Sequence, residues 1–581
     1  DDAAHQFIET RPLTTSRGSD ENIGVIKSWL DDCQSNHAFC MQHANTKADL
    51  PTRLVEIIDL DTARLVETAG QVGEYVALSY CWGPNPDDNS MTTRSNLSER
   101  LQPHSLLRNE LPGAIRDAIA IVERLGIRYI WIDAICMVQD DFNDKNFELG
   151  KMSQYYRNSY MTIAVSTTRC TTGFIGTLGR CEKHPKSPLP RDLIPLDVFA
   201  LSMTKDEGQS GKVYVREENP YRLSEEPINK RAWTLQEGVL APRVLLFGSR
   251  VIWFCQHMTH SDGGVEDWSF DETELERTRR EFQVELSKLD REGSSKGAHA
   301  STATDANNTR DIYGLWHRIV GSYSRRDVSH PSDKLPAISA IAAEFSRLSN
   351  DDYLAGLWRS NLARDLLWRT PQPETHRPPQ WRAPSWSWAS VDDAIIYDEV
   401  PPPTATLLAE VLDVETVPLT TTVPFGEVSQ GRLVISALSW RMKFSGDEDR
   451  EHMSAPFLKA FGFNPGTSER EMLLEALKLY SRPEWKESED EKKKFQLPDD
   501  FVVVLIYGLR DELAEFDDTD GDGETEGEGK TQLWTTWGLI LKPTGVGEGD
   551  EELFERVMSF WQVPVRMEGP DPLPRRTLHI I

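Results

Sequence analysis

The sequence predicts an α/β protein: a parallel sheet flanked by helices, followed by a helical extension and a C-terminal β-rich unit. Between residues 51 and 260, short apolar runs of strand length alternate with amphipathic segments of helical period, which is typical of a parallel sheet with crossover helices. The strand-like runs are apolar enough to be buried on both faces. After residue 400, alternating β-branched runs replace the helical patterns and predict strands.

The elements of the predicted core follow in order along the chain. Leu111-Pro112 opens the clearest helix, in which apolar residues recur every three or four positions until Gly126 ends it. Short apolar runs bounded by polar turns predict the strands. The full series is a strand at 53–60, a strand at 75–79, a helix at 111–126, a strand at 127–133, a helix at 146–158, a strand at 160–165, a helix at 233–240 and a strand at 243–247.

Shifts in composition divide the chain into four parts, since 581 residues are too many for one hydrophobic core. These parts are a helical lead at 1–50, the α/β core at 51–260, a helical extension at 261–400 and the β-rich unit at 401–581. Further features are expected within the last two parts. They are a mobile loop at 293–308, a Trp-rich core anchor at 381–388, a helical insert at 455–482 and an acidic loop at 511–528.

Charge and cysteine usage exclude several classes of protein. The formal net charge is −29, and phosphate-directed binding needs a basic face, so we expect no nucleic-acid partner and no anionic membrane surface. The seven cysteines are odd in number and scattered, which differs from the disulfide framework of small secreted domains and favours a reducing, cytoplasmic location. No run of about 18 apolar residues exists that could span a membrane.

Polar side chains follow the ends of three predicted strands. The run SYCWG at 79–83 ends the first of them, Asp133 ends the second, and Ser166 follows the third. Because ligands bind at the carboxyl ends of strands in open parallel sheets, these residues predict a pocket. Strand-end capping and turn formation by Ser, Asp and Gly is the alternative at each position.

Four separated runs resemble the heterokaryon incompatibility (HET) domain of filamentous fungi. The resemblance covers roughly residues 20–400 and implies a role in nonself recognition and programmed cell death. The predicted helix at 146–158 departs from the family pattern, which leaves Glu148 without an assigned role. The four runs are ALSYCWG at 77–83, LPGAIRDAIAIVERLGIRYIWIDAICMVQDD at 111–141, RAWTLQEGVLAPRVLLF at 231–247 and PSWSWAS at 384–390.

The HET domain is in turn similar at a distance to the Toll/interleukin-1 receptor (TIR) domain, so the resemblance implies a TIR-like core. Some TIR domains hydrolyse NAD through a glutamate four residues after a tryptophan, a spacing that Trp233 and Glu237 reproduce on one helix face. The resemblance therefore implies Glu237 as the catalytic residue of an NAD glycohydrolase, with NAD as substrate and no required cofactor. The residues expected around the NAD are Ser79, Tyr80, Trp82, Gly83, Asp133, Arg231 and Trp233.

These residue types suit the chemistry. Cleavage of the nicotinamide glycosidic bond develops positive charge on the ribose, which a fixed carboxylate stabilises, while an aromatic face can hold a ring in place. Arg231 or Arg243 offers bidentate hydrogen bonds to a pyrophosphate. The alternative for Glu237 is an exposed helix carboxylate or an ion-pair partner, and for Trp82 and Trp233 it is core packing.

The competing functional class is a non-enzymatic signalling or scaffold module. Such a module would act through self-association or through another protein as its trigger, and its tryptophans would be purely structural. The two classes differ in one measurable property, because only the enzyme depletes NAD and releases nicotinamide.

Cys33, His37, Cys40 and His43 are residue types that bind zinc. Their spacing matches no recognised zinc knuckle, and Cys and His also pack as ordinary residues on the amphipathic helix that precedes them. We therefore expect no metal at these four residues.

Two further features are expected to be structural. Cys81 and Cys136 lie at strand ends without a paired His nearby, so buried thiols are expected rather than nucleophiles. The run at 518–523 resembles the start of an EF-hand loop, but Gly529 stands where a bidentate Glu is needed, so a solvated acidic loop is expected.

Overall fold

The computed structural model describes most of the chain as two compact units, one formed by 1–329 with 337–348 and the other by 330–336 with 349–581. Within the described residues, no helix is both long and apolar enough to cross a membrane. The four-part division expected from composition remains a prediction. The described residues are 16–38, 40, 48–83, 91–175, 198–204, 210–216, 223–248, 250–262, 274–294, 312–371, 376–397, 401–443, 500–515, 532–547, 551–566 and 574–581.

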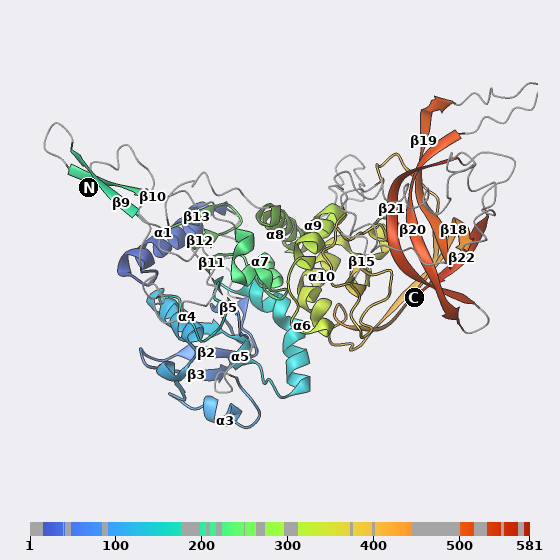
Figure 1. Cartoon of the computed structure of the whole chain (residues 1–581). Helices are drawn as coiled ribbons and strands as arrows, with labels where there is room; N and C mark the ends of the chain where they lie inside the picture. Colours follow the sequence, from blue (N-terminus) through green and yellow to red (C-terminus); the bar gives the residue numbers. More distant parts are fainter. Residues whose placement is uncertain are drawn as a thin grey trace, which may run out of the picture. The chain divides into compact units, whose positions relative to one another are not determined.

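The first unit is built on a nine-stranded sheet with the order β13-β12-β11-β8-β5-β7-β2-β3-β6 (Figure 1). Its central strands consist of apolar runs without alternation, and every residue of β5, β8 and β11 is buried. The strands are β2 (Arg53–Ile57), β3 (Thr62–Glu67), β5 (Val76–Tyr80), β6 (Leu106–Leu107), β7 (Tyr129–Trp131), β8 (Met161–Val165), β11 (Val244–Phe247), β12 (Val251–Phe254) and β13 (Thr259–Ser261).

The four central strands β11, β8, β5 and β7 run parallel, as the sequence predicted. The outer strands do not: β12 and β13 on one side and β2, β3 and β6 on the other pair antiparallel. The expectation of a wholly parallel sheet is therefore wrong at both margins. Consecutive outer strands such as β2 and β3 are joined by short turns, which allow a hairpin but not the long crossover that parallel pairing requires.

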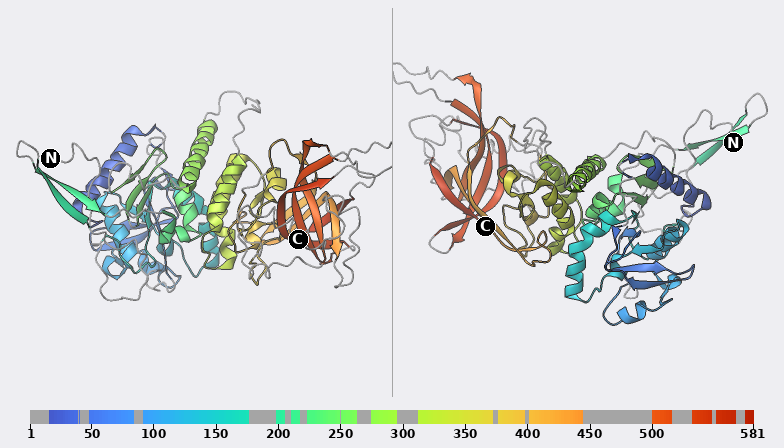
Figure 2. Two further views of the ribbon diagram at one scale, coloured as in Figure 1. Left: turned by 45° about the horizontal axis from the view of Figure 1, so that its top comes forward. Right: turned by 180° about the vertical axis from the view of Figure 1, so that it is seen from behind.

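Helices cover both faces of this sheet. β7 lies on one side of β5 and β8 on the other, so right-handed crossovers place α4 and α6 on opposite faces. α7 packs beside α6 and against β5 and β8, as the green and cyan ribbons in Figures 1 and 2 show. The main helices are α1 (Asp20–Asn36), α4 (Gly113–Arg124), α6 (Phe142–Asn158), α7 (Thr234–Leu240), α8 (Glu274–Ser294), α9 (Ile312–Ser324) and α10 (Pro336–Ser349).

Smaller elements complete the first unit. The short helices α3 and α5 have no side-chain hydrogen bond at their N-caps, and one residue, Ile132, separates the end of β7 from α5. Two separate two-stranded sheets pair antiparallel. The bounds are α3 (Leu97–Arg100), α5 (Asp133–Cys136), β1 (Ala48–Asp49) paired with β4 (Val72–Gly73), and β9 (Val198–Thr204) paired with β10 (Ser210–Arg216).

The second unit contains strands that form a closed, barrel-like ring, in which all pairings are antiparallel except the parallel pairing of β21 with β22. β18 pairs with both β19 and β22, and the pairings β19–β20, β20–β21 and β21–β22 complete the circle (Figure 2). This confirms the expected C-terminal β-rich unit. The strands are β16 (Thr406–Leu407), β17 (Glu410–Pro418), β18 (Val428–Lys443), β19 (Asp500–Glu515), β20 (Gln532–Val546), β21 (Glu552–Arg566) and β22 (Arg575–Ile580), preceded by β14 (Tyr353–Leu354), β15 (Leu357–Trp358) and α11 (Leu362–Asp365).

Buried tryptophans anchor the second unit. Trp368 donates a hydrogen bond from Nε1 to the Trp386 carbonyl at 2.9 Å, and Trp388 donates to the Gly356 carbonyl at 2.9 Å. Gly356 has a φ of +101°, and a Cβ there would lie 2.6 Å from Trp388 Nε1, so only glycine fits. The expected anchor at 381–388 is thus confirmed for Trp386 and Trp388, whereas Trp381 is 54% exposed and is not part of it.

Several sequence expectations lie wholly or partly outside the described residues. The insert at 455–482 lies wholly outside them, as do residues 295–308 of the expected mobile loop and 516–528 of the expected acidic loop. Residues 293–294 instead end α8, and 511–515 belong to β19. The likeness of the core to a TIR domain also remains a prediction.

Candidate active site

The carboxyl end of β5 meets the middle of α7. Glu237 lies on α7 with 6% of its surface exposed, and Ser79, the penultimate residue of β5, donates a side-chain hydrogen bond to its carboxyl group. Trp233 is the N-cap of α7 and stands one helical turn before Glu237. The surface alternative for Glu237 is therefore wrong, because α7 buries this side chain against the sheet and α6.

Burial raises the pKa of Glu237 from 4.5 to about 7. The negative charge of Asp133 acts in the same direction, while the Ser79 hydrogen bond and the positive charges of Arg231 and Arg326 oppose it. At neutral pH the carboxyl group therefore titrates, which is the property expected of a group that exchanges protons during a reaction.

Asp133 joins this site from the first turn of α5, which follows β7. Trp82 Nε1 donates to Asp133 Oδ2 at 2.9 Å, and the Ala134 backbone N–H donates to Oδ1 at 2.7 Å. Burial raises the pKa of Asp133, although these hydrogen bonds and one from the Tyr80 hydroxyl partly offset the effect. Two predicted residues of the β5 end, Tyr80 and Trp82, thus converge on a third.

Two arginines balance the two carboxyl groups. Arg231 donates from Nη1 to the Tyr80 carbonyl at 2.7 Å, and its charge lowers the pKa of both Asp133 and Glu237. Arg326 donates to Thr234 Oγ1 at 3.0 Å, and burial lowers its own pKa to about 10. We call Asp133, Glu237, Arg231 and Arg326 the carboxyl cluster.

Two members of this neighbourhood were missed by the sequence analysis. Tyr156 on α6 donates its hydroxyl to the Leu78 carbonyl at 3.2 Å, and burial next to Glu237 and Asp133 raises its pKa. Arg326 follows α9, and the Asp327 carbonyl after it accepts from the Ala232 backbone at 2.9 Å. Neither residue lies in a motif near a strand end, so no local signal marked it.

The remaining predicted contacts lie beside the cluster in the chain. Gly83 follows Trp82 with a φ of +88°, a left-handed conformation that favours glycine. Trp233 is half-buried before α7. The structure therefore brings Ser79, Tyr80, Trp82, Asp133 and Arg231 together with Glu237, while the roles assigned to all eight residues stay predictions.

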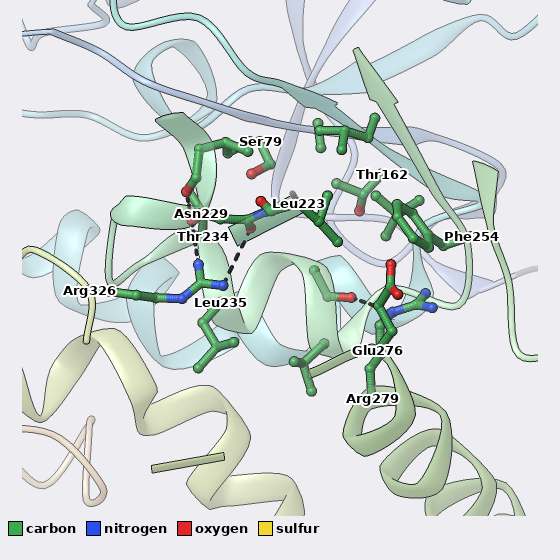
Figure 3. Close-up of a pocket in the computed structure, with 16 residues that line it drawn as sticks. Ser79, Thr162, Leu223, Asn229, Thr234, Leu235, Phe254, Glu276, Arg279 and Arg326 are labelled. Atoms are coloured by element: carbon green, nitrogen blue, oxygen red, sulfur yellow. Dashed lines mark hydrogen bonds between the residues drawn. The ribbon is translucent and has the colours of Figure 1, made fainter. Parts of the chain in front are cut away.

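A cavity of about 70 Å³ lies beneath α7 (Figure 3). Ser79 lines this cavity, but Glu237 does not. The α7 residues that line it are Thr234, Leu235, Gly238 and Val239. Its volume suits a few water molecules, whereas pockets for small-molecule ligands usually measure about 300–1,000 Å³. This cavity is therefore too small for a ligand of that size, and Trp82 and Arg231, which are not among its lining residues, are only half-buried.

Polar groups stand at both ends of this mainly apolar cavity. Figure 3 shows Arg326 at one end, with its hydrogen bonds to Thr234 and Asn229, and Glu276 with Arg279 at the other. Arg279 donates to the Gly238 and Ala241 carbonyls at 2.9 and 2.8 Å, which satisfies the C-terminal end of α7. Both ends of the α7 segment are thus held by arginines from other helices or loops.

The other candidates from the sequence lie elsewhere or are inert. Burial raises the pKa of Cys81, and it raises that of Cys136 to about 12, so both remain thiols as expected. Arg243 precedes β11 and therefore lies at the amino end of the parallel strands, opposite the carboxyl cluster. Cys33, His37 and Cys40 converge there, and His43 lies outside the described residues.

The comparisons with known proteins point to one family. No curated protein and no solved structure matches this chain. Residues 75–237 match the family model described as heterokaryon incompatibility protein (HET), a segment that runs from the start of β5 to Glu237 and contains Asp133 and Arg231. This part of the chain is therefore a HET domain, as its sequence motifs indicated.

Proposed function

We propose that this protein acts in heterokaryon incompatibility and cell death by hydrolysing NAD, with Glu237 as the catalytic carboxylate. The HET domain itself indicates the incompatibility and cell-death role. The observation that supports the chemistry is the Glu237 carboxyl group, which is buried at the carboxyl end of β5, held by Ser79 and titrates at a pKa of about 7.

In the proposed reaction the bond between the ribose C1′ and the nicotinamide nitrogen breaks. The electron pair leaves with the ring, so nicotinamide departs as a neutral molecule and positive charge develops on the ribose. The ionised form of Glu237 stabilises that charge. The electrostatic attraction between the carboxylate and the ribose is strongest in a site from which water is excluded. Water then adds to C1′, and its proton passes to the Glu237 carboxylate, whose pKa of about 7 allows it to accept and release a proton at neutral pH.

The neighbouring groups have proposed roles that follow from their chemistry. Asp133 can accept hydrogen bonds from ribose hydroxyls, and the half-buried Trp82 and Trp233 offer aromatic faces for a ring. Arg231 is assigned to the pyrophosphate, because guanidinium hydrogen-bonds phosphate oxygens bidentately. One of its amino groups already donates to the Tyr80 carbonyl, which fixes the guanidinium in position.

A second function has its own supporting observation. Within the carboxyl cluster, Arg231 and Arg326 balance the charges of the two acids, and Glu237 is only 6% exposed. Such a network also suits a purely structural role, in which the domain signals by self-association or by docking another protein. This non-enzymatic function is the alternative to NAD hydrolysis.

One experiment separates the two functions. Purified full-length protein is incubated with NAD at a micromolar and at a much higher protein concentration, so that self-association can occur, and released nicotinamide is quantified by chromatography. The enzyme is expected to release nicotinamide, and Glu237→Gln is expected to reduce the rate by about 100-fold or more.

The matched control is Glu110→Gln, the same substitution at an exposed position after β6. It is expected to leave the rate unchanged. If the concentrated wild-type protein leaves NAD intact, the enzymatic function is excluded and the non-enzymatic one stands. If the wild type is active and Glu237→Gln retains full activity, Glu237 is not the catalytic carboxylate.

A further inference from the structure

Four ligand atoms of the kind that bind zinc converge behind helix α1. They belong to Cys33, His37, Cys40 and Cys255, and all four side chains are buried. Cys33 lies on α1, His37 is its C-cap, and Cys255 directly follows β12. We infer that this group, the thiol cluster, is a structural zinc site.

The spacing of the four atoms suits a single tetrahedral ion. All of them lie within 4.8 Å of one another, and Cys255 Sγ is 3.5 Å from His37 Nδ1. Zinc bonds of about 2.3 Å to sulfur and 2.0–2.1 Å to nitrogen place tetrahedral ligand atoms roughly 3.5–3.8 Å apart. The cluster therefore needs only a small contraction to hold the ion, and three thiolates with one imidazole form a common structural ligand set.

The surroundings supply the contacts that zinc ligands usually have. His37 directs Nδ1 into the cluster and places Nε2 3.2 Å from Asp32 Oδ2, which is the carboxylate–histidine–metal arrangement that orients a ligating imidazole. The Met258 backbone N–H lies 3.4 Å from Cys255 Sγ and can donate to a thiolate. These contacts would hold two of the four ligands in position.

Charge also favours bound zinc. Three thiolates and one Zn²⁺ carry a net charge of −1, which is costly to bury without a partner. Arg243 is 1% exposed and directs Nε to Cys33 Sγ at 3.4 Å, and it donates from Nη2 to the Cys40 carbonyl at 2.9 Å. The arginine thus supplies the compensating positive charge next to the cluster.

The site would tie the N-terminal helix to the sheet. Cys33, His37 and Cys40 come from one short segment, whereas Cys255 directly follows β12, the strand that pairs with β11. All four coordination positions would be filled by protein, which is typical of structural rather than catalytic zinc. The sequence predicted no zinc site because it grouped Cys33, His37 and Cys40 with His43, their neighbour in the chain. Cys255, which lies far away in the sequence, joins them only in the folded chain.

The test measures metal in the full-length protein. Protein purified under reducing conditions from zinc-supplemented cells is analysed by mass spectrometry of its metal content, and one zinc per chain is expected. Replacement by Co²⁺ is expected to give an intense tetrahedral spectrum with thiolate-to-cobalt charge-transfer bands. Less than stoichiometric zinc together with the absence of these bands would overturn the site, as would a disulfide among the three cysteines.

Variants assign the ligands. Cys255→Ser is expected to lower zinc affinity at least 10-fold. His43→Ala and Cys81→Ser are expected to leave zinc affinity unchanged; Cys81 is a buried cysteine directly after β5 and lies outside the thiol cluster. Equal affinity of Cys255→Ser and the wild type, or loss of zinc in His43→Ala, contradicts the proposed ligand set. Should Cys255→Ser fail to fold, the cobalt spectrum of the wild type decides, because only a thiolate-rich site produces those bands.

Discussion

The two buried clusters of the first unit lie at opposite ends of the parallel strands, and their buried charges are compensated in different ways. The carboxyl cluster gathers around Ser79 at the carboxyl end of β5, where two arginines offset two acids. The thiol cluster lies next to Arg243 at the amino end of β11, where four ligand atoms are close enough together to bind one ion. One edge is thus balanced by side-chain charges fixed in the fold, while the other is complete, in our inference, only with a metal.

The two clusters would lose different contributions to stability if one component were removed. Removing a cation from the carboxyl cluster leaves a buried acid without a partner, and the cost appears directly in stability. Removing a ligand from the thiol cluster instead costs the binding energy of the ion. Three variants probe the carboxyl cluster and the sheet beside it, and their expected effects on stability decrease from Arg326→Met through Glu237→Gln to Thr162→Val.

Arg326→Met is expected to destabilise the protein most. The side chain is 7% exposed and donates to Thr234 Oγ1, and it also faces Glu237. Breaking one partner of a buried charge network costs about 3–5 kcal/mol. Urea unfolding measures the loss, and Arg325→Met, at the exposed neighbouring position, serves as the control with an expected change under about 0.5 kcal/mol. Equal effects of the two substitutions would show that Arg326 does not balance the cluster.

Glu237→Gln is expected to remove a pH dependence of stability. The folded protein holds a proton on Glu237 up to about pH 7, while the unfolded chain releases it near 4.5, so wild-type stability falls as the pH rises through this range. The shift corresponds to about 3 kcal/mol. The uncharged glutamine lacks this loss, so the variant gains stability relative to the wild type between pH 4.5 and 7.

Thermal unfolding over this pH range provides the measurement, with Glu110→Gln as the exposed control that should follow the wild-type curve. Parallel curves for wild type and Glu237→Gln would mean that the Glu237 carboxyl group is not held at a raised pKa. The carboxyl cluster would then be an ordinary ion pair and no longer a contrast to the thiol cluster.

Thr162→Val is expected to have the smallest effect, and a stabilising one. Thr162 is fully buried on β8, it lines the cavity under α7, and its Oγ1 has no hydrogen-bond partner among the described groups. Replacing an unsatisfied buried hydroxyl by a methyl group of similar shape is expected to stabilise the protein by about 1 kcal/mol.

A matched control exists for this substitution. Thr92 is equally buried, but its hydroxyl donates to the Ile135 carbonyl at 2.5 Å and accepts from Arg100 at 2.9 Å. Thr92→Val is therefore expected to destabilise by about 1–3 kcal/mol. A loss of stability in Thr162→Val as well would show that the region between the two clusters needs a hydroxyl group.

Local patterns predicted the central part of the fold well. The apolar periodicity of α4 and the unbroken apolar runs of β5 and β8 each report burial that the structure confirms. β3 was missed, because its alternating burial is that of an outer strand with one exposed face and its apolar residues are few. The same limitation led to the expectation of a wholly parallel sheet.

The candidate site was predictable where its residues stand at strand ends. Ser79 and Asp133 follow that rule, and the carboxyl ends of neighbouring parallel strands must meet at one edge. Tyr156 and Arg326 could not be found this way, because one lies within a helix and the other in a loop after α9. Their proximity to Glu237 depends on how α6 and α9 pack, which local periodicity does not encode.

Local patterns along the chain already carry the HET motifs, the central strands and helices and the position of Glu237 one turn after Trp233. The folded chain adds the burial of Glu237 near Asp133 and the charges of two arginines, and it brings Cys255 to Cys33. The physical reason is the same in both cases. Hydrophobic periodicity reports which face of an element is buried, but strand order and helix packing decide which distant side chains meet there.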